Sequence, residues 1–206
     1  MPMLRNWSHL SQMQLHDAQG KRLYLTADER LAFMAAAARA ARPVRTLCAV
    51  LHTTGCRISE ALALTPEHVD LPGKAVVFET LKKRRRGVYR AVPVPLGLLD
   101  QLDLVHGLRE ALKRGRGHAD RPLWPCSRMT AWRQVTAVMQ AADIPAGPHR
   151  SPKGLRHGFG VHAISSGVPL NMLSKWMGHA TLEVTAIYAN ALGAEEQSIA
   201  ARMWGG

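Results

Sequence analysis

Apolar residues keep a helical spacing along nearly the whole sequence, and the spacing changes at one place. Between residues 75 and 94, the pattern of a β-strand occurs twice, first over 75–79 and then over 88–94, where Pro93 and Pro95 end the second strand. Two neighbouring strands joined by a short segment form an antiparallel pair. The pattern therefore predicts a mainly α-helical domain with a small antiparallel β-sheet, an α+β fold.

Capping residues, glycines and prolines define the ends of the predicted helices. Thr26 and Glu29 form a capping box before an apolar run, and Gly55 ends the helix that starts near Pro43. The predicted helices cover residues 27–41, 43–54, 58–64, 96–113, 127–142, 152–166, 169–177, 181–190 and 194–204.

The charge of the chain indicates an acidic partner. Among 206 residues, 27 Lys and Arg outnumber 15 Asp and Glu, so the formal net charge is +12, while a hydrophobic fraction of 47% is typical of a folded protein. Nucleic acid is the first candidate and an anionic membrane surface the second.

Three cysteines without CxxC spacing, no secretory signal and no spanning apolar run predict a cytoplasmic protein, and no metal-ligand pattern is found.

The segment between the two predicted strands is strongly basic. Residues 82–86 read KKRRR, and a further arginine follows on the second strand. Like charges this close repel one another, and a polyanion relieves the repulsion. The alternative is a merely soluble loop. The residues that we predict to contact DNA are Lys83, Arg84, Arg85, Arg86 and Arg90.

Two further stretches place arginines where they could bind an anion. Arg57 follows a helix-ending glycine and precedes Glu60 by three residues. Lys153 and Arg156 are also three residues apart, which puts them on one face of a predicted helix. Taken alone, an arginine beside a glutamate is usually a surface ion pair.

A histidine and a tyrosine form the last pattern. His179 precedes Tyr188 by nine residues, and on one continuous helix this spacing would put them on opposite sides. Gly178 and a capping Thr181 predict instead that His179 lies just before the helix that carries Tyr188. Both side chains can then face one pocket. Taken alone, each has an ordinary explanation as a cap or a packing residue.

In this order, the patterns resemble the tyrosine recombinases of the phage integrase family. The resemblance is carried by TGCRISEALALTPEHVDL, the lysine-bearing hairpin, GLRHGFGVHAISSG and WMGHATLEVTAIYA, and it extends over about residues 26–191. It implies that residues 1–25 are a lead-in segment and that residues 26–192 form the catalytic domain. Residues 193–206 are then expected to form a C-terminal helix that docks on its own or on a neighbouring protomer.

The resemblance implies a site-specific DNA recombinase that cleaves and rejoins strands through a covalent 3′-phosphotyrosyl intermediate, with no metal, ATP or other cofactor. Tyr188 is the expected nucleophile, the arginines bind the phosphate oxygens as planar forks, and His179 donates a hydrogen bond to the phosphate. The expected catalytic residues are Arg57, Lys82, Lys153, Arg156, His179 and Tyr188, with Glu60 as a support that orients them.

Lysines occupy two places in this scheme. Lys82 is expected to protonate the departing 5′-oxygen, and its neighbour Lys83 is the alternative. The family more often has histidine where this chain has Lys153. Imidazole titrates near neutral pH and can accept a proton from tyrosine, whereas a free lysine has a pKa near about 10.4. Lys153 is therefore expected to act mainly as a cationic donor, which leaves the general base open.

Family members usually carry an N-terminal helical domain that closes around DNA, and about 25 residues precede the catalytic domain here. The chain is then a minimal recombinase, depends on another protein, or is truncated. The expected partners are double-stranded DNA, further copies of the chain in a tetramer and an accessory DNA-binding protein, without a membrane. Two rival functions remain, a type IB topoisomerase that reseals the same strand and a weakly catalytic DNA-binding or regulatory protein.

Overall fold

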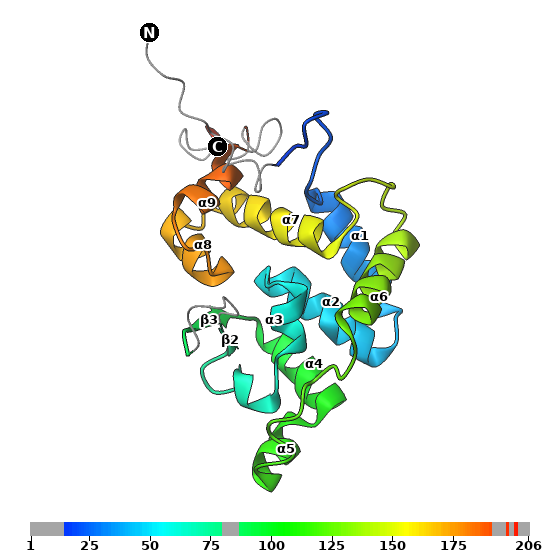
Figure 1. The fold of residues 1–206 in the computed structure, drawn as a ribbon, viewed down its shortest axis with the longest axis vertical. Helices are drawn as coiled ribbons and strands as arrows, with labels where there is room; N and C mark the ends of the chain where they lie inside the picture. The colour runs from blue at the N-terminus through cyan, green and yellow to red at the C-terminus, as the bar shows by residue number, and fades with distance from the viewer. Residues whose placement is uncertain (1–14, 80–86, 191–196, 198–199, 202–206) are drawn as a thin grey trace.

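The computed structural model describes residues 15–79, 87–190, 197 and 200–201. Helices make up most of it, and three short strands form one antiparallel sheet (Figure 1). This arrangement confirms the predicted fold class. The elements in chain order are α1 (Ala27–Ala38), α2 (Arg42–Thr54), α3 (Ile58–Leu62), the 3₁₀ helix η2 (Pro66–His68), β1 (Val69–Asp70), β2 (Ala75–Glu79), β3 (Tyr89–Pro93), α4 (Leu96–His106), α5 (Leu108–Arg114), α6 (Arg128–Ala141), α7 (Pro152–Ser165), α8 (Leu170–Met177), α9 (Glu183–Ala186) and the 3₁₀ helix η3 (Ile187–Asn190).

Most helix ends follow the capping signals of the sequence. The hydroxyl of Thr26 accepts from the backbone of Glu29, whose carboxylate accepts in return from the Thr26 backbone, so the predicted capping box is confirmed. Gly55 ends α2 with a φ of 61°, in the left-handed region that glycine adopts at little cost. The helix predicted over 96–113 is divided, because Gly107 has a φ of 63° and separates α4 from α5.

The sheet has the order β1-β2-β3, and its central pairing matches the prediction. Strands β2 and β3 are antiparallel, with a register that runs from Ala75 opposite Pro93 to Glu79 opposite Tyr89. The two-residue strand β1, which the sequence pattern did not indicate, adds to the other edge of β2. The segment that joins β2 to β3 contains the predicted basic tip, and five of the predicted site residues lie there, outside the described residues: Lys82, Lys83, Arg84, Arg85 and Arg86.

Helix α2 is the centre of the larger hydrophobic core and packs against α1, α4, α6 and α7. Its residues Leu47 and Val50 are fully buried, and burying such a side chain contributes about 1.5–3 kcal/mol. A smaller cluster joins α7 to α8 and η3 and includes Phe159, Leu173 and Tyr188. Helix α7 therefore lies between the two cores, a position that Figure 1 shows above α3.

The described part of the predicted lead-in packs against the domain. Leu15, Tyr24 and Leu25 are buried, and the Leu25 backbone N–H donates to the carbonyl of Gly154 at the start of α7. Across the stretches that the structure describes, no helix has the length and apolar character that crossing a lipid bilayer requires. Of the helix predicted over 194–204, only residues 197 and 200–201 are described, and they are helical.

Candidate active site

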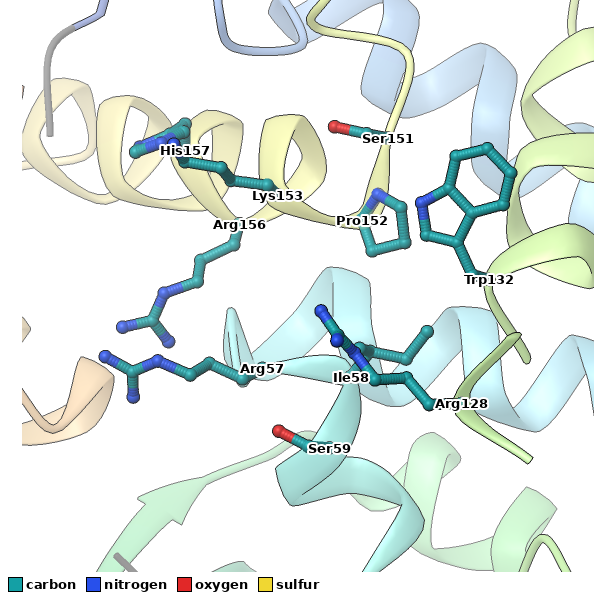
Figure 2. A pocket seen from close by; sticks show the side chains of 10 residues that line it. All are labelled: Arg57, Ile58, Ser59, Arg128, Trp132, Ser151, Pro152, Lys153, Arg156 and His157. Carbon is teal, nitrogen blue, oxygen red and sulfur yellow. The ribbon is translucent and has the colours of Figure 1, made fainter. Parts of the chain in front are cut away.

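A pocket of about 320 Å³ opens between α7, the start of α3 and the start of α6 (Figure 2). Its lining residues include several cations and no carboxylate, so the pocket suits an anion. They are Arg57, Ile58, Ser59, Arg128, Trp132, Ser151, Pro152, Lys153, Arg156 and His157. Lys153 and Arg156 both reach this pocket from α7, which confirms that they share one helical face.

Arg57 is positioned by a carboxylate one helical turn further on. It occupies the N-cap position of α3, and Glu60 accepts both from its backbone N–H at 2.8 Å and from its guanidinium at 2.9 Å. The Glu60 side chain is 2% exposed, whereas that of Arg57 is 42% exposed. The buried carboxylate thus anchors an arginine whose charged end stays accessible in the pocket.

The structure places Arg90 inside the protein, contrary to the expectation that it contacts DNA. Its guanidinium pairs with Glu60 at 2.7 Å, donates to the carbonyl of Trp176 at 2.8 Å and lies over the ring of Phe78. Residues alternate between the two faces of a strand, and Arg90 shares the inner face of β3 with the buried Val92. That alternation is the sequence signal that predicts its burial.

Glu60 therefore serves two arginines. Burial alone would raise the pKa of its carboxyl group, but the charge and hydrogen bonds of Arg90, together with the backbone and charge of Arg57, outweigh burial and lower the pKa. The carboxylate is ionised at neutral pH and balances one buried and one accessible cation. It holds the backbone and guanidinium of Arg57 in place, while its role as a support for catalysis stays a prediction.

Arg156 is held by carbonyls instead of a carboxylate. It is 6% exposed and donates to the carbonyls of Gly55 at 2.6 Å and Met177 at 2.8 Å. Burial lowers its pKa to about 10, so it keeps its charge at neutral pH. Figure 2 shows its guanidinium beside that of Arg57, and the charge of Arg57 contributes to lowering the pKa. An anion beside them would accept from Arg57 and would replace the acceptors to which Arg156 donates here.

His179 contacts Arg156 directly. The two side chains are 3.0 Å apart at His179 Nε2, and because a guanidinium can only donate, Nε2 is the acceptor. The ring proton is then on Nδ1, which donates to the hydroxyl of Thr185 at 2.8 Å. Burial, followed by the charges of Arg156 and Arg57, lowers the pKa of His179 to about 3. In this arrangement the imidazole is neutral and its Nε2 is occupied by Arg156.

Tyr188 lies in η3, fully buried, with its ring stacked on that of His179 at a centroid distance of 6.1 Å. The prediction that His179 precedes the helical segment of Tyr188 is therefore confirmed, but neither side chain is among the residues that line the pocket described above. The predicted cap at Thr181 is wrong, because α9 begins only at Glu183, with Leu182 at the N-cap and no side-chain cap hydrogen bond. Burial raises the pKa of Tyr188 to about 12, although Arg156 and Arg57 act in the opposite direction.

Two residues of α7 form the seat of this phenol. A Cβ atom at Gly160 would lie 2.5 Å from the Tyr188 ring, so the position requires glycine. His157 Nδ1 lies 3.2 Å from the phenol oxygen. Burial, followed by the charges of Lys153 and Arg156, lowers the pKa of His157 to about 4, so this imidazole is also neutral.

The sequence analysis did not assign roles to several residues that the structure brings to the site. His157 follows Lys153 by four residues and so shares its helix face, which is the available signal. Arg128 and Trp132 show the same spacing on α6, where both are exposed and line the pocket. Within the described ranges, no three His, Cys, Asp or Glu side chains gather in a way that could hold a metal ion.

The sequence matches the family model described as "Phage integrase family" over residues 23–195. The chain belongs to this family. It is 33% identical over 187 residues to the tyrosine recombinase XerD of Mycobacterium leprae, an alignment that covers 82% of this chain and 57% of that protein. With XerD of Mycobacterium tuberculosis H37Rv, it shares 34% identity over 150 residues, covering 70% of this chain and 46% of that protein. The chain thus spans about half the length of the curated relatives it matches.

Solved structures of family members have the same fold. A crystal structure of the XerA recombinase superposes with a TM-score of 0.70 at 21% identity, covering 87% of this chain and 64% of that one. The XerH site-specific recombinase bound to its difH substrate, in a pre-cleavage complex, superposes with a TM-score of 0.68 at 20% identity and covers 96% of this chain and 61% of that one.

Proposed function

We propose that this chain is the catalytic part of a site-specific DNA recombinase that cleaves and rejoins strands through Tyr188. The observation that carries the proposal is a continuous set of contacts beside a cationic pocket, in which Arg156 touches His179, His179 stacks on Tyr188, and Tyr188 touches His157. Membership of the phage integrase family and relatives named tyrosine recombinases support it.

The pocket supplies what a scissile phosphate needs. Arg57 and Arg156 carry planar forks that match phosphate oxygens, and Arg156 keeps its charge in a site without carboxylates on its walls. Arg128 and Trp132 extend this surface along α6 with a cation and an aromatic ring, a combination suited to a DNA strand. Double-stranded DNA is therefore the proposed partner.

The chemical step is a displacement at phosphorus. The Tyr188 oxygen forms a bond to phosphorus, the bond to the 5′-oxygen breaks, and that oxygen takes a proton, for which Lys82 is the proposed donor. A second 5′-hydroxyl reverses the step and reseals the strand.

Exchange between two DNA sites requires four active sites, so a tetramer is proposed, and an accessory DNA-binding protein is a further proposed partner.

His157 is the proposed acceptor of the phenol proton, a role that the sequence left open. In this structure burial raises the pKa of Tyr188 to about 12 and lowers that of His157 to about 4, so the proton stays on the phenol. A bound phosphodiester brings a negative charge to Arg156 and Lys153, which favours protonated His157. The proton then transfers as the bond to phosphorus forms.

Covalent capture tests the proposal. The probe is a pool of short DNA duplexes with a randomised centre and nicks at varied positions, which trap the cleaved strand by losing the 5′-hydroxyl fragment. We expect a detergent-resistant adduct whose DNA sequences converge on one motif, and its yield should fall by at least about 10⁴-fold in Tyr188→Phe.

The matched control is Tyr89→Phe, which removes a phenol that is 57% exposed on β3 and should leave the adduct unchanged. Thermal melting of each variant verifies that it is folded. If the wild-type chain forms no adduct with any duplex in the pool, the proposal fails. Adducts spread over unrelated sequences would instead favour a type IB topoisomerase.

A further inference from the structure

A second pocket, of about 300 Å³, lies between α1, the end of α2, α7 and α8. It shares no lining residue with the candidate active site. Phe159, Val168 and Trp176 supply apolar walls, whereas one end is lined by Arg30 and His52. A small concave site with apolar walls and a few convergent polar groups is typical of a ligand pocket.

Arg30 is a buried cation that has no carboxylate partner among the residues that the structure describes. It is 5% exposed, and its Nη1 has no hydrogen-bond partner among the described residues. Its Nη2 makes only long contacts, 3.4 Å to the ring and 3.3 Å to the carbonyl of His52. The neighbouring Glu29 pairs with Arg22 at 2.6 Å instead. Burial lowers the pKa of Arg30 to about 10, so it stays charged at neutral pH.

His52 adds a second unsatisfied donor. Because the Arg30 guanidinium can only donate, His52 Nε2 accepts, and the proton of the neutral ring is on Nδ1. That Nδ1 is buried and also has no partner among the described residues. Burial, with the charges of Arg30 and His162, lowers the pKa of His52 to about 3, which keeps the ring neutral. Two residues that line one pocket therefore each have a buried N–H donor without an acceptor among the described residues.

A comparison with Arg90 shows what is missing. Arg90 is buried to a similar extent, 7% exposed, but it has the Glu60 carboxylate at 2.7 Å and a carbonyl at 2.8 Å. Buried charges in folded proteins are normally paired in this way, since an unpaired one carries a large desolvation cost. In the described part of the chain, Arg30 has no such carboxylate partner. A bound anion would supply the missing charge and accept from both donors.

We propose that this pocket binds a small tetrahedral oxyanion of the phosphate class, held by Arg30 and His52. Thr53 and Ser166 also line the pocket, and a hydroxyl group is able to donate to further oxygens of the anion. The site is distinct from the one that would bind the scissile phosphate, and the inference does not depend on the proposed recombinase activity.

Thermal melting of the full chain in sodium phosphate, against sodium chloride of equal ionic strength, tests the site. At a phosphate concentration tenfold above its dissociation constant, the melting temperature should rise by roughly 3–6 °C. Arg30→Gln should lose most of this rise. Arg39→Gln, which removes an exposed arginine after the same helix, should keep it and so corrects for general effects of phosphate on stability.

Arg57→Gln separates the two anion sites, because it weakens the candidate active site and leaves this pocket intact. A rise that persists in Arg30→Gln but disappears in Arg57→Gln would overturn the proposal. A crystal of the wild-type protein soaked in tungstate gives a test that needs no folded variant. Anomalous density beside Arg30 is the expected result, and density only between Arg57 and Arg156, or none, would refute the site.

A binding titration with duplex DNA distinguishes the two possible sources of the anion, the DNA backbone and a small molecule. If the phosphate belongs to the DNA backbone, Arg30→Gln should weaken DNA binding several-fold and inorganic phosphate should compete with DNA for the wild-type protein. If the anion is a small molecule, DNA affinity should be the same for Arg30→Gln and Arg39→Gln, while the melting shift in phosphate still distinguishes them.

Discussion

The two sides of the candidate active site hold their charged groups in different ways. On the side of α3 and β3, the buried carboxylate of Glu60 lies between Arg57 and Arg90 and balances them. On the side of α7 and η3, Arg156 is held by carbonyls and by His179, and Tyr188 lies against neutral imidazoles. The described residues give Arg156 no carboxylate partner.

This difference separates a side held by a buried ion pair, which we call the frame, from a side held by weaker contacts. An ion pair in which both partners are buried resists rearrangement, because separating the partners leaves an uncompensated charge. Carbonyls and imidazoles hold a cation less strongly, so an incoming phosphate can replace them as acceptors for Arg156. We infer that the first side sets the position of the phosphate, while the second side is the one that reorganises to bring Tyr188 out of its buried position.

The largest effect is expected from removing one partner of the frame. Arg90→Met keeps the side-chain volume but leaves Glu60 buried with only Arg57, so the free energy of unfolding should fall by about 3–5 kcal/mol in urea denaturation. The matched control is Arg109→Met, which breaks the ion pair of an exposed arginine with Asp103 and should cost less than about 1 kcal/mol.

The pH dependence of the same variant checks the cause. Since the pKa of Glu60 is lowered in the folded chain, its contribution is complete above about pH 5 and is lost as the pH falls further. The stability difference between wild type and Arg90→Met should therefore shrink on acidification. A constant difference from neutral to acid pH would show that packing, not the ion pair, explains the loss.

The next effect concerns the proton of Tyr188. His157→Gln can still bond to the phenol but cannot take its proton, so the single-turnover rate of adduct formation should fall by roughly 10²-fold with little change in DNA affinity. The dependence of this rate on pH should flatten as well. Lys153→Gln is the matched change on the same helix face. It should weaken DNA binding but should change the pH dependence of the rate only slightly. The reverse outcome would make Lys153 the base.

The smallest effect is expected from adding a methyl group at Gly160, next to the Tyr188 ring. A methyl group at Gly160 would meet the Tyr188 ring, so Gly160→Ala should cost about 1–3 kcal/mol of stability and displace the ring toward solvent. The pKa of Tyr188 should then fall from about 12 toward the ordinary value, which ultraviolet titration of tyrosine ionisation measures.

Gly97→Ala is the control for this change, because an added Cβ on that α4 residue has no heavy atom within 4 Å. It should leave the tyrosine titration unchanged. If Gly160→Ala also leaves it unchanged, the ring stays buried after the change, which contradicts the inference that the second side reorganises readily.

Features that depend on local sequence were predictable. The capping box at Thr26, the stop at Gly55 and the strand patterns of β2 and β3 act within a few residues, and each was located from the sequence. The placement of His179 just before the segment of Tyr188 also followed from a local signal, the glycine between α8 and α9.

Features that depend on distant contacts were not predictable. The hydrogen bond of Arg90 to Trp176 joins residues 86 apart, and the contact of His157 with Tyr188 joins residues 31 apart. A local pattern gives the face on which a side chain lies, but not which distant partner covers it. The burial of Tyr188 is the main example. Its spacing from His179 predicted that it belongs to the site but did not indicate that it is shielded from solvent.

The sharing of Glu60 between two arginines has an evolutionary consequence. A single mutation that removes this carboxylate leaves two cations unbalanced at once, one in the interior and one in the pocket. Replacements at positions 60 and 90 are then tolerated mainly when they arise together. Among descendants of this chain, these two positions should therefore show correlated substitution, and loss of either residue alone should mark a lineage in which selection on the site has relaxed.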